Sequence, residues 1–386
     1  MNRTVYLDNS ATTKPCKAAV EAINNCLTEN WGNPSSSYLL GIDALETIED
    51  ARKTVAASIG AKPDEIYFTG SGTEADNWAI KAVAQAYREK GRHIITTKIE
   101  HPSVGNVMKH MEEDGFEVTY LPVDENGIVK LDKLKEALRP DTMLVSVMHV
   151  NNEIGAVQPI EEIGKIVKAN NKATLFHVDA IQGYGKYRIY PKKMGIDLLS
   201  VSGHKIHGPK GVGFLYCDSK VKIKPILFGG GQQKDLRSGT ENVPGIVGIA
   251  EAAKEIYTDF EAKIERLYDI KAYFVEKISE LDGTKINGLT EKESAPHVVS
   301  VSFPGVRSEV LLHSLEDKEV YASAGSACSS NKPAVSATLK AINAPKEHLD
   351  STLRFSFSVH TTKEEIDYCI EVLKGLLPML RRYARH

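Results

Sequence analysis

From about residue 64 to residue 216, short apolar, β-prone runs alternate with stretches whose apolar residues recur every three to four positions. The first pattern is typical of buried strands and the second of amphipathic helices. An alternation of strands and helices favours a largely parallel sheet with helices on both faces. The sequence therefore predicts an α/β fold around a mainly parallel sheet. Seven strands are expected, at residues 65–69, 93–97, 116–123, 142–150, 174–178, 197–201 and 212–216.

The pattern changes near Pro244. Apolar residues continue at helical spacing over residues 245–281, which predicts one long helix of about 55 Å at 1.5 Å per residue. The elements expected after it, strands at 298–303 and 353–357 and helices at 308–316, 333–342 and 362–382, suit a smaller α+β unit. We therefore expect a large domain over residues 13–255 and a small C-terminal domain over residues 256–386, with residues 1–12 packing near the small one.

Composition and charge indicate which partners and which cellular location to expect. The 386 residues include 48 Lys and Arg against 51 Asp and Glu, a net charge of −3 that gives no reason to expect a nucleic acid or an anionic membrane as partner. No apolar run approaches the ~18 residues of a membrane span. The first residues also lack the hydrophobic segment of a signal peptide. A cytoplasmic protein is the expectation.

The five cysteines are scattered, and none of their spacings signals a disulfide framework or a metal site. Cys16, Cys26, Cys217 and Cys369 lie in or beside helical or strand patterns, and we interpret them as structural. Cys328 lies in ASAGSACSSN at residues 322–331, where no large apolar neighbour could bury its thiol. This pattern predicts an exposed cysteine on a mobile loop. Its thiol is either incidental or takes part in the function of the protein.

Polar groups follow one predicted strand after another. In an open α/β sheet, ligands bind beyond the carboxyl ends of the parallel strands. Successive predicted strands deliver reactive groups to this edge, and so many in a row favour a binding site: residues 70–74 (GSGTE), 100–101 (EH), 151–153 (NNE), 179–182 (DAIQ) and 202–205 (SGHK).

Lys205 and Asp179 are the most informative of these groups. A lysine at a strand end among apolar neighbours can act as a nucleophile toward an aldehyde. A carboxylate from the neighbouring strand would keep a pyridine nitrogen protonated, and the two together match what pyridoxal phosphate requires. The alternative for the pair alone is a buried ion pair or two solvated charges.

Three further features each have a structural alternative. GSGT at residues 70–73 suits a phosphate at a helix start, although Ser or Thr there also serves as a plain N-cap. His101 could stack on a planar cofactor and exchange protons, or be an ordinary core or surface histidine. Arg354, between apolar residues of a strand, could hold a carboxylate or form a structural salt bridge.

Ordered motifs over nearly the whole chain resemble those of the NifS/IscS-like cysteine desulfurases, which are fold-type I pyridoxal-phosphate enzymes of the class-V aminotransferase family. The motifs that carry this resemblance are YLDNSATT at residues 6–13, GNPS at 32–35, GTE at 72–74, EH at 100–101, HVNNEIG at 149–155, HVDAIQ at 177–182, SGHK at 202–205, RSGT at 237–240, GSAC at 325–328 and RFS at 354–356.

The resemblance implies a role in cofactor binding for several residues. Lys205 would form the Schiff base, and Asp179 would contact the pyridine nitrogen. Gln182 would bind the ring hydroxyl, while His101 would stack on the ring and move protons. Asn152 would also contact the cofactor.

The phosphate of the cofactor would be held from two subunits. Gly72 and Thr73, together with Ser202 and His204, would bind it from one subunit of a homodimer. Thr240 would bind it from the partner subunit.

The resemblance also implies the substrate and the reaction. Asn33, Asn152 and Arg354 would bind the carboxylate of L-cysteine, and Cys328 would accept its sulfur, leaving L-alanine and an enzyme persulfide. A cluster scaffold or a tRNA-thiolation enzyme would receive the sulfur. The alternatives are an aminotransferase or a selenocysteine lyase on the same fold, or a sulfur-relay protein without turnover.

Overall fold

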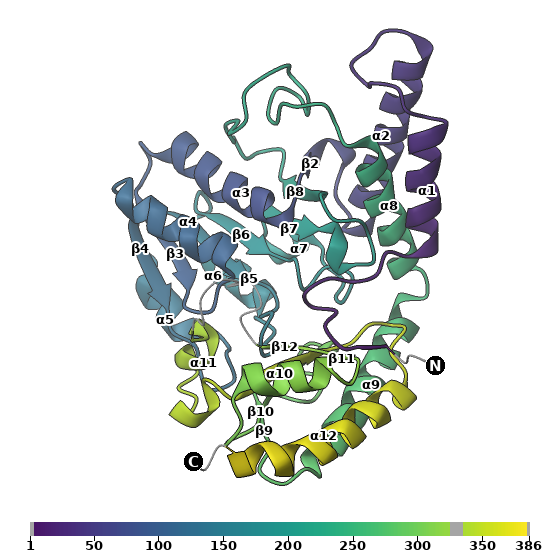
Figure 1. Ribbon diagram of the computed structural model, residues 1–386. Helices are drawn as coiled ribbons and strands as arrows, with labels where there is room; N and C mark the ends of the chain where they lie inside the picture. Colours follow the sequence, from purple (N-terminus) through teal and green to yellow (C-terminus); the bar gives the residue numbers. More distant parts are fainter. Residues whose placement is uncertain (1–3, 325–334, 384–386) are drawn as a thin grey trace.

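The computed structural model describes residues 4–324 and 335–383. At its centre lies a seven-stranded sheet in the order β2-β8-β7-β6-β5-β3-β4 (Figure 1). β8 runs antiparallel to both of its neighbours, and the other pairings are parallel. The predicted, mainly parallel α/β sheet is confirmed. Its strands are β2 (Ile66–Thr69), β3 (His93–Thr97), β4 (Glu117–Leu121), β5 (Thr142–Met148), β6 (Leu175–Asp179), β7 (Leu198–Ser202) and β8 (Gly213–Cys217).

Helices cover both faces of this sheet, because successive strand residues point to opposite sides. Ile94 packs in one hydrophobic cluster with α3 and α4, and Ile95 packs in another with α1, α2, α6 and α8. The strands are therefore apolar on both faces. The helices of this part are α1 (Lys17–Thr28), α2 (Leu39–Ser58), α3 (Gly72–Tyr87), α4 (Pro102–Glu113), α5 (Leu131–Ala137), α6 (Ile160–Asn170), α7 (Pro191–Met194) and α8 (Val243–Tyr257), with the 3-10 turns η1 (Pro63–Glu65) and η2 (Gly203–Lys205).

A second core lies around a four-stranded antiparallel sheet of order β12-β13-β10-β9 (Figure 1). Val5 and Leu7, close to the start of the chain, are fully buried in this core. The expected boundary between a large and a small domain, between residues 255 and 256, stays a proposal. The elements here are β1 (Val5–Tyr6), α9 (Phe260–Ser279), β9 (Lys285–Asn287), β10 (Val298–Ser302), α10 (Ser308–Glu316), β11 (Val320–Tyr321), β12 (Ser323–Ala324), α11 (Ala337–Ala341), η3 (Lys346–His348), β13 (Thr352–Ser356) and α12 (Lys363–Tyr383).

The prediction of one long helix over residues 245–281 is wrong. The chain leaves the helical conformation at Thr258 (ψ 130°), and Asp259 adopts the left-handed region (φ 50°) before α9 begins. Apolar spacing does not reveal this break, because each helix buries its own stripe. Ile249 of α8 packs in the core of the large sheet, and Phe274 of α9 packs in the core of the small one.

The expected helix over residues 333–342 is shorter where the structure describes it. α11 begins at Ala337, and Ser336 is its N-cap, with the Ser336 hydroxyl accepting from Leu339 N. Within residues 4–324 and 335–383, no helix combines the length and the apolar character needed to cross a membrane.

Two helical glycines test how tightly the layers pack. A Cβ atom added at Gly164 of α6 would lie 2.0 Å from the carbonyl oxygen of Met194, whereas one at Gly375 of α12 would meet nothing within 4 Å. We expect Gly164→Ala to destabilise the protein by about 1–3 kcal/mol through this clash. Gly375→Ala should stabilise it by about 0.5–1 kcal/mol through helix propensity. Thermal unfolding of both variants measures the difference, and a shift of equal sign in the two would contradict this account.

Candidate active site

The carboxyl ends of the parallel strands bring predicted side chains to one edge of the large sheet. β6 ends at Asp179, and its neighbour β7 ends at Ser202 and leads directly into the turn η2 with Lys205. The prediction that Asp179 and Lys205 follow adjacent strands is therefore confirmed. Parallel pairing produces this arrangement, because it makes both strands end at the same edge.

The Asp179 carboxyl is enclosed at this edge, with only 4% of the residue exposed. Its Oδ1 accepts a hydrogen bond from Ile181 N at 2.9 Å. Burial raises the pKa of Asp179 to about 6, and the Ile181 N–H and the charge of Lys205 oppose that rise. Asp179 is thus not a solvated surface charge, and it lies within the electrostatic reach of Lys205.

The loop at residues 8–13 lies against Lys205. Lys205 Nζ donates to the carbonyl oxygens of Ser10 at 2.5 Å and Ala11 at 2.8 Å. Gln182 Nε2 donates to the same Ser10 oxygen at 3.0 Å. The loop is itself tied to η2, since Thr13 N donates to His204 O at 2.8 Å. The sequence did not predict that the backbone carbonyls of Ser10 and Ala11 contact Lys205, although both residues lie in the YLDNSATT motif.

The start of α3 lies against the ends of two neighbouring segments. Ser71 is the N-cap and accepts a hydrogen bond from Glu74 N at 3.1 Å, so the N-cap alternative describes this serine correctly. A Cβ atom at Gly72 would lie 2.3 Å from Ile181 Cδ1 and 3.1 Å from Ser202 Cβ, so a larger residue here would force the Ile181 and Ser202 side chains to shift. Thr73 is exposed in the first turn, next to backbone N–H groups that have no partner within the helix.

His101 caps the next helix, α4, from the same edge. Its Nδ1 accepts from Ser103 N at 3.2 Å and lies 2.8 Å from Ser103 Oγ. Burial lowers the pKa of His101 to about 4, and the nearby charges of Lys205 and Arg354 lower it further. His101 lines a hollow of about 520 Å³ together with Thr73. The imidazole is therefore neutral near pH 7 and borders an open space.

Arg354 is buried in β13, with 3% of the residue exposed. Its Nη2 donates to Asp8 Oδ1 at 2.8 Å and its Nη1 to the Asn152 carbonyl oxygen at 2.9 Å. The structural salt bridge left open by the sequence is therefore present, with a partner that sequence reasoning missed. Because the bond to Asn152 uses its backbone, the Asn152 side chain takes no part in it. Arg354 and Asn152 are brought together across the two sheets.

Two predicted residues are exposed in other parts of the chain. Asn33 lies in the loop between α1 and α2, at the end of the molecule away from the small sheet, and its Oδ1 accepts from Ser35 N at 2.9 Å (Figure 1). Thr240 is exposed in the segment between β8 and α8. The structure does not bring Asn33 beside Arg354 within this chain, and its role stays a prediction.

Cys328 lies outside the described residues, whereas the other four cysteines are buried, as expected for structural residues. The described chain on either side is anchored near Arg354. Ser323 of β12 pairs with Arg354, and Ser336 Oγ donates to Glu153 Oε2 at 2.5 Å. Both anchors thus attach to segments that carry predicted substrate residues.

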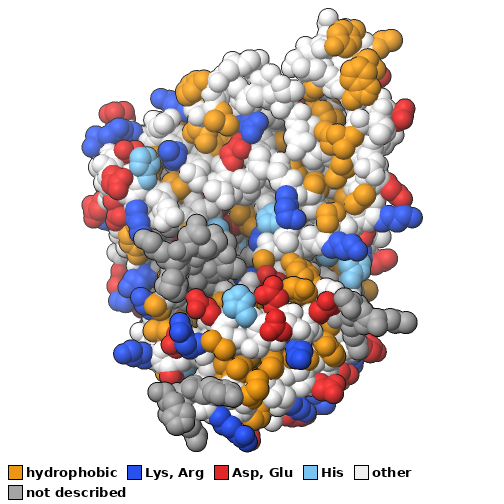
Figure 2. Space-filling view, in the orientation of Figure 1, with side chains coloured by type: hydrophobic (Ala, Val, Ile, Leu, Met, Phe, Trp, Pro, Cys, Tyr) orange, Lys and Arg blue, Asp and Glu red, His pale blue; other side chains and the backbone are white. Residues whose placement is uncertain are grey.

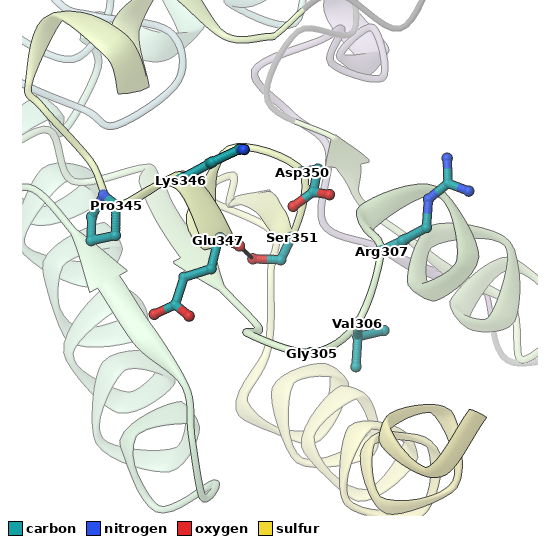
Figure 3. Close-up of a pocket in the computed structure, with 8 residues that line it drawn as sticks. All are labelled: Gly305, Val306, Arg307, Pro345, Lys346, Glu347, Asp350 and Ser351. Carbon is teal, nitrogen blue, oxygen red and sulfur yellow. Dashed lines mark hydrogen bonds between the residues drawn. The ribbon is translucent and has the colours of Figure 1, made fainter. Parts of the chain in front are cut away.

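A second hollow is lined by none of the predicted site residues. It has a volume of about 630 Å³, and its charged side chains carry both signs. Figure 3 shows its lining: Gly305, Val306, Arg307, Pro345, Lys346, Glu347, Asp350 and Ser351. In the described part of the chain, no group of three or more His, Cys, Asp or Glu side chains could hold a metal ion. The edge of the large sheet therefore remains the candidate active site.

The sequence pattern of class-V aminotransferases matches residues 5–369. The chain belongs to the aminotransferase class-V family. It is 46% identical to a Methanosarcina thermophila protein named cysteine desulfurase IscS, over 99% of this chain and 94% of the relative. It is 44% identical to the IscS-named protein of Dictyoglomus turgidum, over 99% and 96%. A solved NifS-like protein superposes with a TM-score of 0.93 at 39% identity, covering 98% of this class-V chain and 100% of the other.

Glu100 precedes His101 and was noted in the sequence only as a strand-end group. Its Oε1 accepts from Thr97 Oγ1 at 2.7 Å and from Met148 N at 3.0 Å, and its buried Oε2 has no hydrogen-bond partner among the described residues. Burial raises the pKa of Glu100 from 4.5 to about 8. Between these values the folded protein binds more protons than the unfolded chain, so stability falls as the pH rises toward 8.

Replacement of Glu100 tests this linkage. Glu100→Gln cannot ionise, so its stability relative to the parent should increase between pH 5 and pH 9, by on the order of 1 kcal/mol or more. Thermal unfolding midpoints across this range give the measurement. The exposed Glu125→Gln is the matched control and should follow the parent. Parallel curves for Glu100→Gln and the parent would show that Glu100 is ionised throughout.

Proposed function

We propose that this class-V chain is a pyridoxal-phosphate-dependent cysteine desulfurase that removes sulfur from L-cysteine and leaves L-alanine. The observation that carries the proposal is the placement of a buried Asp179 and of Lys205 after adjacent parallel strands, at one edge of the sheet. The names of relatives at 44–46% identity support the choice of reaction. An aminotransferase on the same fold would need a keto-acid co-substrate, which the first assay below can exclude.

The residues at the sheet edge fit this cofactor. Gly72 approaches Ser202 closely, an approach that a Cβ would crowd, and the first-turn amides of α3 beside them suit a phosphate. Asp179 is a buried carboxyl of the kind that a pyridinium N–H can satisfy, and Lys205 would hold the aldehyde carbon. By the resemblance, Thr73 and His204 would complete the phosphate contacts, Gln182 would bind the ring hydroxyl, and Asn152 would also contact the cofactor.

When bound, the cofactor would supply an electron sink that stabilises negative charge on the substrate's α-carbon. Lys205, once released by the substrate amine, would take the α-proton, and His101 would exchange a proton at its Nε2. Arg354 would bind the substrate carboxylate by exchanging or sharing its ion pair with Asp8. Asn152 and Asn33 would complete this grip by the resemblance.

Cys328 is the proposed sulfur acceptor. Its thiolate would attack the sulfur of the substrate, so that an S–S bond forms while the Cβ–S bond breaks. The bonding electron pair of Cβ–S stays with the substrate, and one proton added at Cβ together with the return of the α-proton from Lys205 gives L-alanine. The sulfur then remains on Cys328 as a persulfide for an acceptor such as a cluster scaffold or a tRNA-thiolation enzyme, in the cytoplasm.

We propose that the protein is a homodimer that pairs through an exposed apolar surface on α1 and α2. Figure 2 shows hydrophobic side chains gathered over this end of the visible face. Leu39 is 76% exposed and Trp31 is 67% exposed, which is costly for a monomer. The α1–α2 apolar surface consists of Val20, Leu27, Trp31, Tyr38, Leu39, Leu40, Ile42 and Leu45. By the resemblance, Thr240 would reach the phosphate of the partner subunit.

The first test is L-alanine formed from L-cysteine with a thiol reductant, with sulfide counted in parallel and no keto acid added. Lys205→Ala should lose the visible absorbance of a lysine-bound cofactor and at least ~10²-fold of the activity, because both the anchor and the base are gone. Cys328→Ala should keep that absorbance and lose the persulfide. The controls are the exposed Lys210→Ala and the buried Cys26→Ala.

Equal sulfide release by Cys328→Ala and the parent would remove Cys328 from the mechanism. An unchanged visible spectrum in Lys205→Ala would refute the assignment of the lysine. Turnover only after a keto acid is added would identify an aminotransferase instead.

Mixed dimers test the proposed contribution of Thr240. A hybrid of one Lys205→Ala subunit and one Thr240→Asp subunit contains one intact site only if Thr240 serves the partner's site. We expect such a hybrid, purified through two different tags, to regain about half of the parent activity while each variant homodimer stays inactive. An inactive hybrid would place Thr240 in its own subunit's site.

The dimer surface itself is tested by Leu39→Asp, which places a charge in the proposed interface. Light scattering after gel filtration should show a monomer for Leu39→Asp. Val310→Asp is the control, since Val310 is a 45% exposed residue of α10 outside the α1–α2 apolar surface, and it should remain dimeric. A dimeric Leu39→Asp protein would move the interface elsewhere.

A further inference from the structure

A chain of short contacts runs from His101 into the core of the large sheet. His101 Nδ1 lies 2.8 Å from Ser103 Oγ, and Ser103 Oγ lies 2.7 Å from Asp76 Oδ2. Ser103 is 6% exposed and Asp76 is fully buried in α3. No assigned role in cofactor or substrate binding accounts for either residue. Because the buried Asp76 carboxyl is connected to an imidazole that would exchange protons, the protonation state of Asp76 affects that of His101.

The hydrogen atoms shared among His101, Ser103 and Asp76 limit the protonation states that these three groups can adopt. The Ser103 hydroxyl donates to Asp76 Oδ2 at 2.7 Å, and its oxygen lies 2.8 Å from His101 Nδ1. Ser103 N donates to the same Nδ1 at 3.2 Å when that nitrogen carries no proton. A hydroxyl has one hydrogen, so these contacts are compatible with two protonation states. In one state Asp76 is ionised and His101 carries its proton on Nδ1; in the other Asp76 is protonated and donates to Ser103, Ser103 donates to Nδ1, and His101 carries its proton on Nε2.

The surroundings favour the state in which Asp76 is protonated. Burial raises the pKa of Asp76 well above the usual range, and the charges of Asp179 and Glu100 add to this rise, although hydrogen bonds from Ser103 and Ser200 oppose it. His177 Nε2 lies 3.6 Å from Asp76 Oδ1, but burial lowers the pKa of His177 to about 3, so it adds no positive charge at neutral pH. Around His101, the cations Lys205 and Arg354 oppose an imidazolium.

These charges create a difficulty for a proton-exchanging His101. When Nε2 accepts a proton from the substrate side, an imidazolium would form beside two cations in a buried site. A second proton acceptor connected to Nδ1 removes this difficulty, because the imidazole can pass one proton on as it accepts another. Ser103 and Asp76 provide that connection.

We propose that Asp76 is the proton store of His101, reached through the hydroxyl of Ser103. In the accepting state Asp76 is ionised, His101 carries its proton on Nδ1, and Nε2 is bare. When Nε2 takes a proton, the Nδ1 proton moves to Ser103 Oγ and the Ser103 hydroxyl proton moves to Asp76 Oδ2. The reverse sequence returns a proton from Nε2. Asp76 and Ser103 are positioning residues that keep the imidazole neutral, a role that rests on the proposed function of His101.

The relay makes a prediction that needs no turnover. As Asp76 loses its proton with rising pH, His101 must switch from the Nε2–H to the Nδ1–H tautomer at the same midpoint. The infrared carbonyl band of the buried carboxylic acid, identified by its loss in Asp76→Asn, reports Asp76. The ¹⁵N shifts of labelled histidine, assigned with His101→Gln, report the tautomer. Both are measured on the purified holoenzyme.

Ser103→Ala removes the hydroxyl and should uncouple the two titrations, whereas Ser103→Thr should retain the coupling. A role for Ser103 as a mere helix-start residue predicts no tautomer change in any of the three proteins. A His101 tautomer that is constant through the Asp76 titration, a switch that persists in Ser103→Ala, or an acid band that never titrates would each overturn the proposal.

The activity of the same proteins separates this inference from the proposed function. With L-cysteine as substrate, Ser103→Ala should lose about tenfold in kcat, a part of the ~10²–10⁴-fold range of acid–base catalysis, with an altered pH profile. Ser103→Thr should recover both. The exposed Asn106→Ala, at the same hollow, should match the parent. Coupled titrations in a parent protein that forms no alanine would retain the relay and reject the desulfurase.

Discussion

The parallel pairing of β5, β6 and β7 beneath two layers of helices decides where the polar groups of this chain can lie. Because both faces of these strands are covered by helices, the strands can present groups to a ligand only where they end. All of the parallel strands end at one edge. Asp179 and Lys205 therefore lie at the same edge, where α3 begins at Gly72 and His101 forms the N-cap of α4.

This edge holds more buried charge than an ordinary core. Asp179, Glu100 and Asp76 all have raised pKa values because burial removes water from their carboxyls. Burial lowers the pKa of His101, and the positive charges of Lys205 and Arg354 lower it further. Raised carboxyl pKa values and a neutral imidazole limit the number of full charges that this buried cluster must hold. The same feature allows protons to move within it, which is what the proposed reaction requires.

The sequence predicted the elements of the large sheet well, because apolar periodicity follows directly from burial on one or both faces. It also predicted that Asp179 and Lys205 would be neighbours, since one strand–helix–strand step separates them. It failed where one residue's backbone decides the outcome. Asp259 breaks the expected long helix by adopting a left-handed conformation that leaves the apolar spacing of α8 and α9 intact.

The sequence by itself determined which chemistry was available: a strand-end lysine, an acid one step away, and motifs shared with a known family. Only the tertiary structure decided which groups act together. The Asp8–Arg354 ion pair joins residues 346 positions apart, and Ser103 connects His101 to an Asp76 that lies on a different helix. Such contacts depend on how elements pack in space, and local periodicity carries no record of that packing.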